Sequence, residues 1–127
     1  METVVRKICL DSDVVISLLN KDEPTYVSLQ KLNATFCITA ITSFEIWCGK
    51  NKPETVFEIL ESFHTLDFDT HAGRLAGDIF RKLKEQGRLI EMRDIFIGAI
   101  CIKNNMELFT LNKKHFERLK EFGLILV

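Results

Sequence analysis

Short apolar runs alternate with segments of helical periodicity along this chain, and that alternation limits the folds open to it more than any other feature. Residues 4–10 form an apolar run without a 3.6-residue rhythm, which is typical of a buried parallel strand. Residues 34–39 are rich in β-branched and aromatic side chains and predict a second strand. Shorter strands are predicted at residues 65–68, 107–110 and 124–127.

Helical segments are predicted between these strands. Pro53 suits a first helical position, and Gly87 suits a helix stop. The expected helices cover residues 12–19, 25–32, 40–47, 53–63, 70–86 and 94–104, with one or two helical turns over 113–120. A chain of 127 residues is long enough for one hydrophobic core but not for two. The pattern therefore predicts a single domain over residues 1–127, a three-layer α/β/α sandwich around a mainly parallel sheet.

Composition narrows the functional classes. A formal net charge of −1 excludes the simplest basic nucleic-acid binder but leaves room for a local basic patch. No apolar run approaches the roughly 18 residues of a membrane span, and the N-terminal residues do not resemble a signal peptide, so we expect a cytoplasmic protein without membrane contact. Without export, the four cysteines are expected to be buried, reduced thiols: Cys9, Cys37, Cys48 and Cys101.

Three acidic residues stand beside apolar segments that are far apart in the chain. Asp11 follows the first predicted strand, Glu45 interrupts the helix over 40–47, and Asp94 opens the apolar helix over 94–104. A carboxylate at the edge of a core is costly unless it is paired, hydrogen-bonded or bound to a metal. Ligands of open parallel sheets bind beyond the carboxyl ends of the strands, where these acids can meet. Carboxylates are the preferred ligands of hard divalent cations, so the layout predicts a metal site suited to phosphate esters.

Each of these residues also has a simpler interpretation. Asp11 and Asp94 are good helix caps, and Glu45 can be a solvated residue on its helix. Ser12 can cap the same helix or contact a phosphate. Asp13 leaves the first turn of the helix in a different direction from Asp11, so we expect it to support the site through hydrogen bonds rather than bind metal directly.

At these residues the chain resembles the PIN-domain family, especially the VapC ribonuclease toxins of prokaryotic toxin–antitoxin pairs. The matching segments occur in family order at residues 10–16, 42–46, 93–100 and 108–116. The resemblance implies that Asp11, Glu45 and Asp94 bind Mg²⁺ or Mn²⁺ and activate water to cut RNA. It also implies a homodimer and inhibition by a cognate VapB-like antitoxin.

The chain departs from the family pattern in its last matching segment. Related toxins often carry an acid at the position of Asn112 or of His115, and neither residue here is acidic. The carbonyl oxygen of Asn112 can orient water or substrate, or accept a metal, but it adds no negative charge. We therefore expect one tightly held metal ion rather than two.

Two basic segments are candidates for contacting the RNA backbone. Residues 81–93 carry five basic and two acidic side chains, a net charge of +3, directly before Asp94. Such a stretch is usually a solvated helix face, but here Arg88 and Arg93 are the first candidates for phosphate contacts. Lys113 and Lys114 are the second.

Two other classes of protein fit parts of the pattern. Residues 8–15 also resemble the nucleophile motif of haloacid-dehalogenase-type phosphatases, in which Asp11 would attack phosphorus and Asp13 would be the general acid. Against that class, no paired acids follow a later strand. A non-catalytic binding module that keeps the fold is the other alternative.

The sequence also predicts a homodimer. Its helices carry more apolar residues than one small core buries; they are Val14, Ile16, Leu18, Leu19, Val27 and Leu32.

Overall fold

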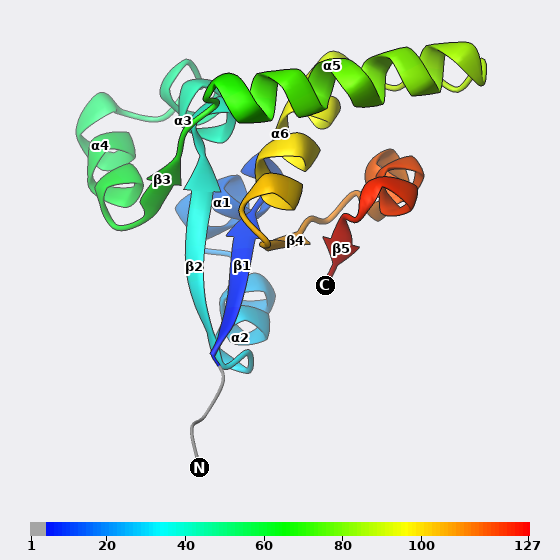
Figure 1. Ribbon diagram of the computed structural model, residues 1–127. Helices are drawn as coiled ribbons and strands as arrows, with labels where there is room; N and C mark the ends of the chain where they lie inside the picture. The colour runs from blue at the N-terminus through cyan, green and yellow to red at the C-terminus, as the bar shows by residue number, and fades with distance from the viewer. Residues whose placement is uncertain (1–4) are drawn as a thin grey trace.

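The computed structural model describes residues 5–127, and a five-stranded parallel sheet lies at its centre (Figure 1). The strand order is β3-β2-β1-β4-β5, and each of the four pairings between neighbours is parallel. The strands are β1 (Arg6–Leu10), β2 (Ala34–Thr39), β3 (His64–Leu66), β4 (Glu107–Phe109) and β5 (Ile125–Leu126).

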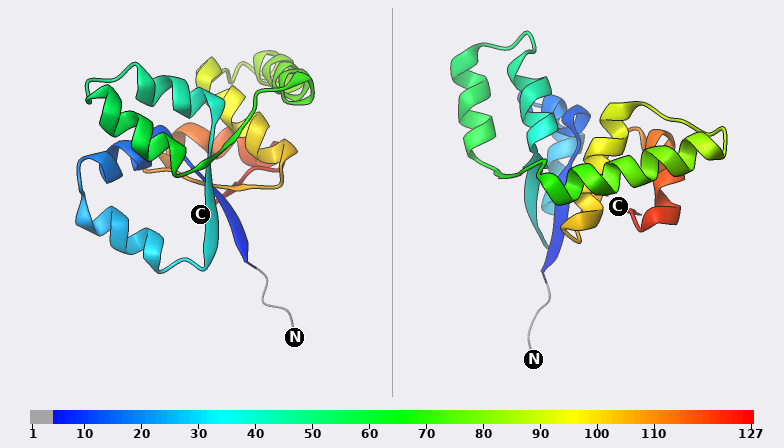
Figure 2. Two further views of the ribbon diagram at one scale, coloured as in Figure 1. Left: turned by 90° about the vertical axis from the view of Figure 1, so that its left-hand side faces the viewer. Right: turned by 45° about the horizontal axis from the view of Figure 1, so that its top comes forward.

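Helices connect successive strands and cover both faces of the sheet (Figure 2). The α-helices are α1 (Ser12–Leu19), α2 (Glu23–Gln30), α3 (Ala40–Trp47), α4 (Pro53–Glu61), α5 (Thr70–Glu85) and α6 (Met92–Lys103), and a 3₁₀ helix, η1 (Lys113–Phe122), precedes β5. None of the helices within residues 5–127 has both the length and the apolar character needed to cross a membrane.

Alternate residues of the strands enter two separate hydrophobic clusters, as the two-residue period of a strand requires. Ile8 and Leu10 pack with residues of α1 to α4, whereas Cys9 between them packs with α5, α6 and η1. The short, almost uninterrupted apolar run of β1 is explained by this burial on both faces. The predicted three-layer α/β/α sandwich is therefore confirmed, and the described sheet is wholly parallel.

Several boundaries differ from the sequence-based expectation. Helix α6 begins at Met92 instead of residue 94, and Glu91 occupies its N-cap position without a side-chain cap. Asp94 thus lies inside the first turn, so its interpretation as a helix cap is wrong. Helix α2 begins at Glu23 instead of residue 25 because the side chain of Asp22 caps it. Residue 4, the expected start of β1, lies outside the described residues.

The cysteines follow the expectation at three positions out of four. All four are free, but Cys48 is exposed, whereas Cys9, Cys37 and Cys101 are buried. Cys48 follows the last residue of α3 and lies outside the packed face of that helix.

The strand order of the sheet reverses between β1 and β4. From β1 the chain proceeds outward to β2 and β3, and it then returns to the other side of β1 to form β4 and β5. Such a reversal of strand order is where open α/β sheets bind ligands. The backbone N–H of Asp11, just after β1, donates to the carbonyl of Phe109 at the end of β4 over 3.0 Å. This hydrogen bond fixes the two strand ends side by side.

Candidate active site

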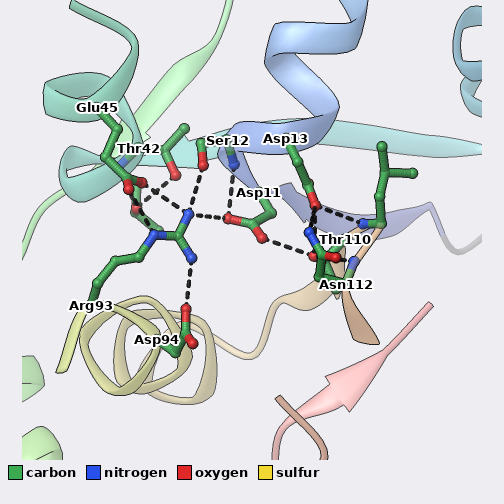
Figure 3. A network of polar contacts seen from close by, with 11 residues as sticks. Asp11, Ser12, Asp13, Thr42, Glu45, Arg93, Asp94, Thr110 and Asn112 are labelled. Atoms are coloured by element: carbon green, nitrogen blue, oxygen red, sulfur yellow. Dashed lines mark hydrogen bonds and ion pairs between the residues drawn. The ribbon is translucent and has the colours of Figure 1, made fainter. Parts of the chain in front are cut away.

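Three carboxylates from three separate segments surround the guanidinium group of Arg93 near these strand ends (Figure 3). Arg93 Nη2 donates to Asp11 Oδ1 over 2.7 Å, and Nη1 donates to Asp94 Oδ1 over 2.6 Å. Both oxygens of Glu45 accept from the same group, Oε2 from Nε at 2.7 Å and Oε1 from Nη2 at 2.9 Å. The three predicted acids thus share one cationic group, the guanidinium of Arg93.

Local structure explains how each acid reaches this point. Asp11 is the N-cap of α1, and its Oδ1 accepts from the backbone N–H of Ser12 over 2.8 Å. Glu45 projects from the second turn of α3, and Asp94 projects from the first turn of α6. Asp11 and Asp94 are buried, while the side chain of Glu45 is 29% exposed. The cap interpretation of Asp11 is correct but incomplete, because the same carboxylate also contacts Arg93.

The charges in this cluster do not balance. Three carboxylates and one guanidinium give a formal charge of −2 when all are ionised. Burial by itself would lower the pKa of Arg93, but the hydrogen bond to Glu45 and the charge of Asp11 raise it, so the guanidinium stays protonated. Burial raises the pKa of the Asp94 carboxyl, against the lowering effect of Arg93. The unbalanced negative charge would attract a further cation.

A second set of polar contacts supports Asp11 from the side of β4. Thr110, which follows β4 as Asp11 follows β1, donates its hydroxyl proton to Asp11 Oδ2 over 2.8 Å. The backbone N–H of Asn112 donates to the Thr110 hydroxyl oxygen over 3.1 Å. Each oxygen of Asp11 therefore has a donor from a different strand end, which fixes the orientation of this carboxylate.

Asp13 and Asn112 form a contact of their own beside Asp11. The side-chain amide of Asn112 donates to Asp13 Oδ2 over 2.8 Å, and the backbone N–H of Leu111 donates to the same oxygen over 3.1 Å. Burial, followed by the charge of Asp11, raises the pKa of Asp13. Figure 3 shows Asn112 on the opposite side of Asp11 from Arg93. Asn112 therefore positions Asp13 in this structure, and its side-chain amide donates to Asp13 rather than to Glu45 or Asp94.

The donor set suits a hard divalent cation, although its present spacing suits the guanidinium. Carboxylate oxygens are the ligands that Mg²⁺ and Mn²⁺ prefer, and three of them converge here. Within residues 5–127, however, no three His, Cys, Asp or Glu side chains are close enough together to hold a metal ion as they stand. Arg93 separates the acids, so a metal would fit between them only after the guanidinium had moved.

The predicted RNA-contacting residues have different surroundings. Lys113 and Lys114 line a cavity of about 810 Å³ beside Thr110, together with Asn112 and His115. Arg88 lies in the turn after α5, where its backbone carbonyl accepts from Arg118 over 2.8 Å. Arg93 points into the acid cluster rather than toward solvent, with 26% of its side chain exposed.

Sequence reasoning did not single out Thr110 or Arg118. Thr110 has a recognisable signal, since it is a polar residue directly after a buried strand, as Asp11 is. Arg118 lines a second cavity, of about 290 Å³, with Asp94, Lys114 and His115. Nothing in the pattern of η1 distinguishes it from the other basic residues of that helix.

The chain belongs to the PIN-domain family, whose model matches residues 8–121. It is 37% identical to "Ribonuclease VapC1" of Methanocaldococcus jannaschii over 98% of this chain and 89% of that protein. It is 30% identical to "Ribonuclease VapC2" of Haemophilus influenzae over 89% of this chain and 92% of that protein. The chain is thus homologous to VapC ribonucleases, and the interpretation as a haloacid-dehalogenase-type phosphatase is wrong.

Solved structures agree with this assignment. A chain of VapBC2 from Rickettsia felis, solved bound to a DNA fragment from their promoter, superposes with a TM-score of 0.77 at 25% identity, over 95% of this chain and 97% of that one. A chain of VapBC-1 from nontypeable Haemophilus influenzae superposes with a TM-score of 0.76 at 23% identity, over 95% and 96% of the two chains. The fold described above is therefore the fold of these proteins.

Proposed function

We propose that this chain is a VapC-type toxin, a metal-dependent ribonuclease that cuts RNA phosphodiesters at the acid cluster. The observation that carries the proposal is the convergence of Asp11, Glu45 and Asp94 on one cationic group at the carboxyl ends of β1 and β4. These acids come from segments far apart in the sequence, so their meeting is a property of the fold. Homology to VapC ribonucleases over nearly the whole chain supports the same activity.

Each residue of the site has a distinct proposed role. Asp11, Glu45 and Asp94 would hold one Mg²⁺ or Mn²⁺ ion. When bound, such an ion lowers the pKa of coordinated water and neutralises charge that develops on the phosphate. Thr110 and the backbone N–H of Ser12 orient Asp11. The loss of a supporting hydrogen bond of this kind typically lowers metal affinity or activity about 10–100-fold.

The cavity beside the acids is proposed to receive the RNA backbone. Lys113 and Lys114 supply positive charge at its wall, and their contribution should weaken as salt is raised, because phosphate binding by lysine releases counterions. Apolar Phe109 and Leu111 line the same cavity and offer surface to an unpaired base. Asn112, which lines this cavity, donates to Asp13, the neighbour of the acid cluster.

RNA cleavage by the purified protein tests the proposed function. Single-stranded and structured RNA should be cut in Mg²⁺ or Mn²⁺ and left intact when EDTA is in excess. Restoring Mg²⁺ after EDTA should restore cutting, which separates metal dependence from denaturation. Intact RNA in both metals, from a preparation whose circular dichroism shows a folded α/β protein, would favour the non-catalytic module instead.

The proposed partners are a VapB-like antitoxin and a second copy of the chain. A chain of similar fold belongs to a solved toxin–antitoxin complex from Klebsiella pneumoniae, which supports an antitoxin for this chain. Helices α1, α2 and α3 leave large apolar side chains exposed, and such surfaces mark interaction sites. They are Ile16, Tyr26, Val27, Phe44 and Trp47.

Oligomeric state and inhibition are measurable on the same preparation. We expect light scattering to give a dimer mass at micromolar concentration. We also expect the cognate antitoxin, encoded by a neighbouring gene, to suppress RNA cutting when the two proteins are mixed in equal amounts. A monomer mass would contradict the homodimer. Unchanged cutting by a mixture that co-purifies as one complex would contradict inhibition by the antitoxin.

A further inference from the structure

Arg93 occupies the position that the proposed function assigns to a metal ion. Its guanidinium uses Asp11 Oδ1, both oxygens of Glu45 and Asp94 Oδ1, and its Nη2 also donates to the Ser12 hydroxyl over 2.6 Å. These are the oxygens that a cation held by the three acids would need. A guanidinium and a divalent cation also repel each other at such short range. The two cations therefore compete for one site.

The position of Arg93 allows its side chain to move out of the acid cluster. It lies in the first turn of α6, beside Asp94, and its side chain is 26% exposed, whereas Asp11 and Asp94 are buried. The acids are held by the ends of β1, α3 and α6, and Asp11 has further donors in Ser12 and Thr110. When a divalent cation enters, the long side chain of Arg93 is thus the part of the cluster with the most freedom to move.

A displaced Arg93 would remain on the same turn of α6 as Asp94, a proposed metal ligand. An RNA phosphate drawn to that metal would be within reach of its guanidinium, and arginine binds phosphate through two parallel hydrogen bonds. The charge relations agree with this exchange. The acids and the guanidinium together carry a formal −2, so a divalent cation brings the whole cluster to neutrality and leaves the freed guanidinium without a full set of anionic partners.

We propose that Arg93 alternates between two partners: the carboxylates of Asp11, Glu45 and Asp94 when no metal is bound, and a phosphate of the RNA backbone once a divalent cation has taken its place. This inference rests on the proposed ribonuclease function for its second partner but not for its first. Metal binding then exposes a phosphate-binding group, so metal and RNA each increase the affinity of the protein for the other.

Metal affinity in the absence of RNA tests the first partner. Mn²⁺ should bind Arg93→Gln more tightly than the wild type in titration calorimetry, by at least about tenfold if the wild-type site is open in one molecule in ten or fewer. Arg81→Gln is the matched control, because Arg81 is exposed on α5 and forms its ion pair with Asp78, outside the acid cluster. Equal or weaker Mn²⁺ binding by a folded Arg93→Gln would overturn the proposal.

A measurement on the wild type keeps the test valid even if Arg93→Gln does not fold. In the metal-free protein the Nε–H of Arg93, which donates to Glu45, should exchange slowly with solvent and give a distinct nitrogen resonance in NMR spectra. Saturating Mg²⁺ should shift that resonance and speed its exchange. A resonance that stays unchanged while Mg²⁺ binds would show that the guanidinium does not move, and would overturn the proposal.

RNA affinity tests the second partner. With a short labelled RNA, and with Ca²⁺ in place of Mg²⁺ to slow cutting, the wild type should bind more tightly in Ca²⁺ than in EDTA, and Arg93→Gln should lose most of that gain. An equal gain in both proteins would overturn the phosphate role. A wrong ribonuclease proposal would give a different result. The wild-type protein would then leave RNA intact in Mg²⁺, whatever the Mn²⁺ affinity of Arg93→Gln.

Discussion

Asp94→Asn is expected to lower RNA cleavage in Mg²⁺ by at least about a hundredfold, the upper end of the effect seen for residues that only support metal ligands. The substitution removes the charge of one proposed ligand while keeping the shape of the side chain. It should leave the fold intact, because Asp94 is buried in a cluster whose formal charge is negative, and an amide there is less costly to bury than a carboxylate. Cleavage rates at saturating Mg²⁺ give the comparison.

A matched acid away from the site controls this experiment. Asp78 lies exposed on α5, where it pairs with Arg81, so Asp78→Asn should cut RNA at the wild-type rate. Thermal unfolding of both variants shows whether they are folded. Wild-type activity in a folded Asp94→Asn protein would remove Asp94 from the site and, with it, the three-acid arrangement.

Phe116→Ala is expected to lower the free energy of unfolding by about 3–5 kcal/mol, as is usual when a buried phenylalanine is truncated. Phe116 is 0% exposed and joins η1 to the cluster formed by α5, α6 and the sheet. That packing holds in place the segment that carries Lys113 and Lys114, so RNA binding should weaken together with stability. Urea unfolding followed by circular dichroism measures the change.

The control is a phenylalanine with little packing to lose. Phe57, on α4, is 57% exposed, and Phe57→Ala should change the free energy of unfolding by no more than about 0.5 kcal/mol. A loss for Phe116→Ala as small as that for Phe57→Ala would mean that Phe116 does not anchor η1, and the account of how the lysines are positioned would have to be abandoned.

The elements that alternate in burial could be predicted from the sequence alone. The bounds of β2 and α3 agree with the prediction because the β-branched run at 34–39 ends at Thr39, whose side chain caps the next helix. The start of α6 could not be predicted in this way, since Glu91 provides no side-chain cap to mark it. Local signals thus predicted the elements. The missing side-chain cap at Glu91 explains the misplaced start of α6, whereas the start of α2 was misplaced although Asp22 caps that helix.

The residues of the candidate site could likewise be predicted only in part. Asp11 and Asp94 are conspicuous because each is a charge beside an apolar segment, and the structure brings both to Glu45. The direction of Arg93 was not predictable, because the basic stretch before Asp94 has the composition of a solvated helix face. Only the relative placement of α6, α3 and the end of β1 turns this side chain inward. Thr110 carries no charge, so its contact with Asp11 gave no comparable signal.

The position of a bound metal tests the central claim most directly. Crystals grown or soaked with Mn²⁺ would reveal the ion through its anomalous scattering. We predict one peak among Asp11, Glu45 and Asp94, at roughly 2.1 Å from their oxygens as for a hard octahedral ion, with the Arg93 side chain turned away from them. An anomalous peak elsewhere, or none, in crystals of a protein that cuts RNA with Mn²⁺ would contradict the claim that these three acids form the catalytic metal site.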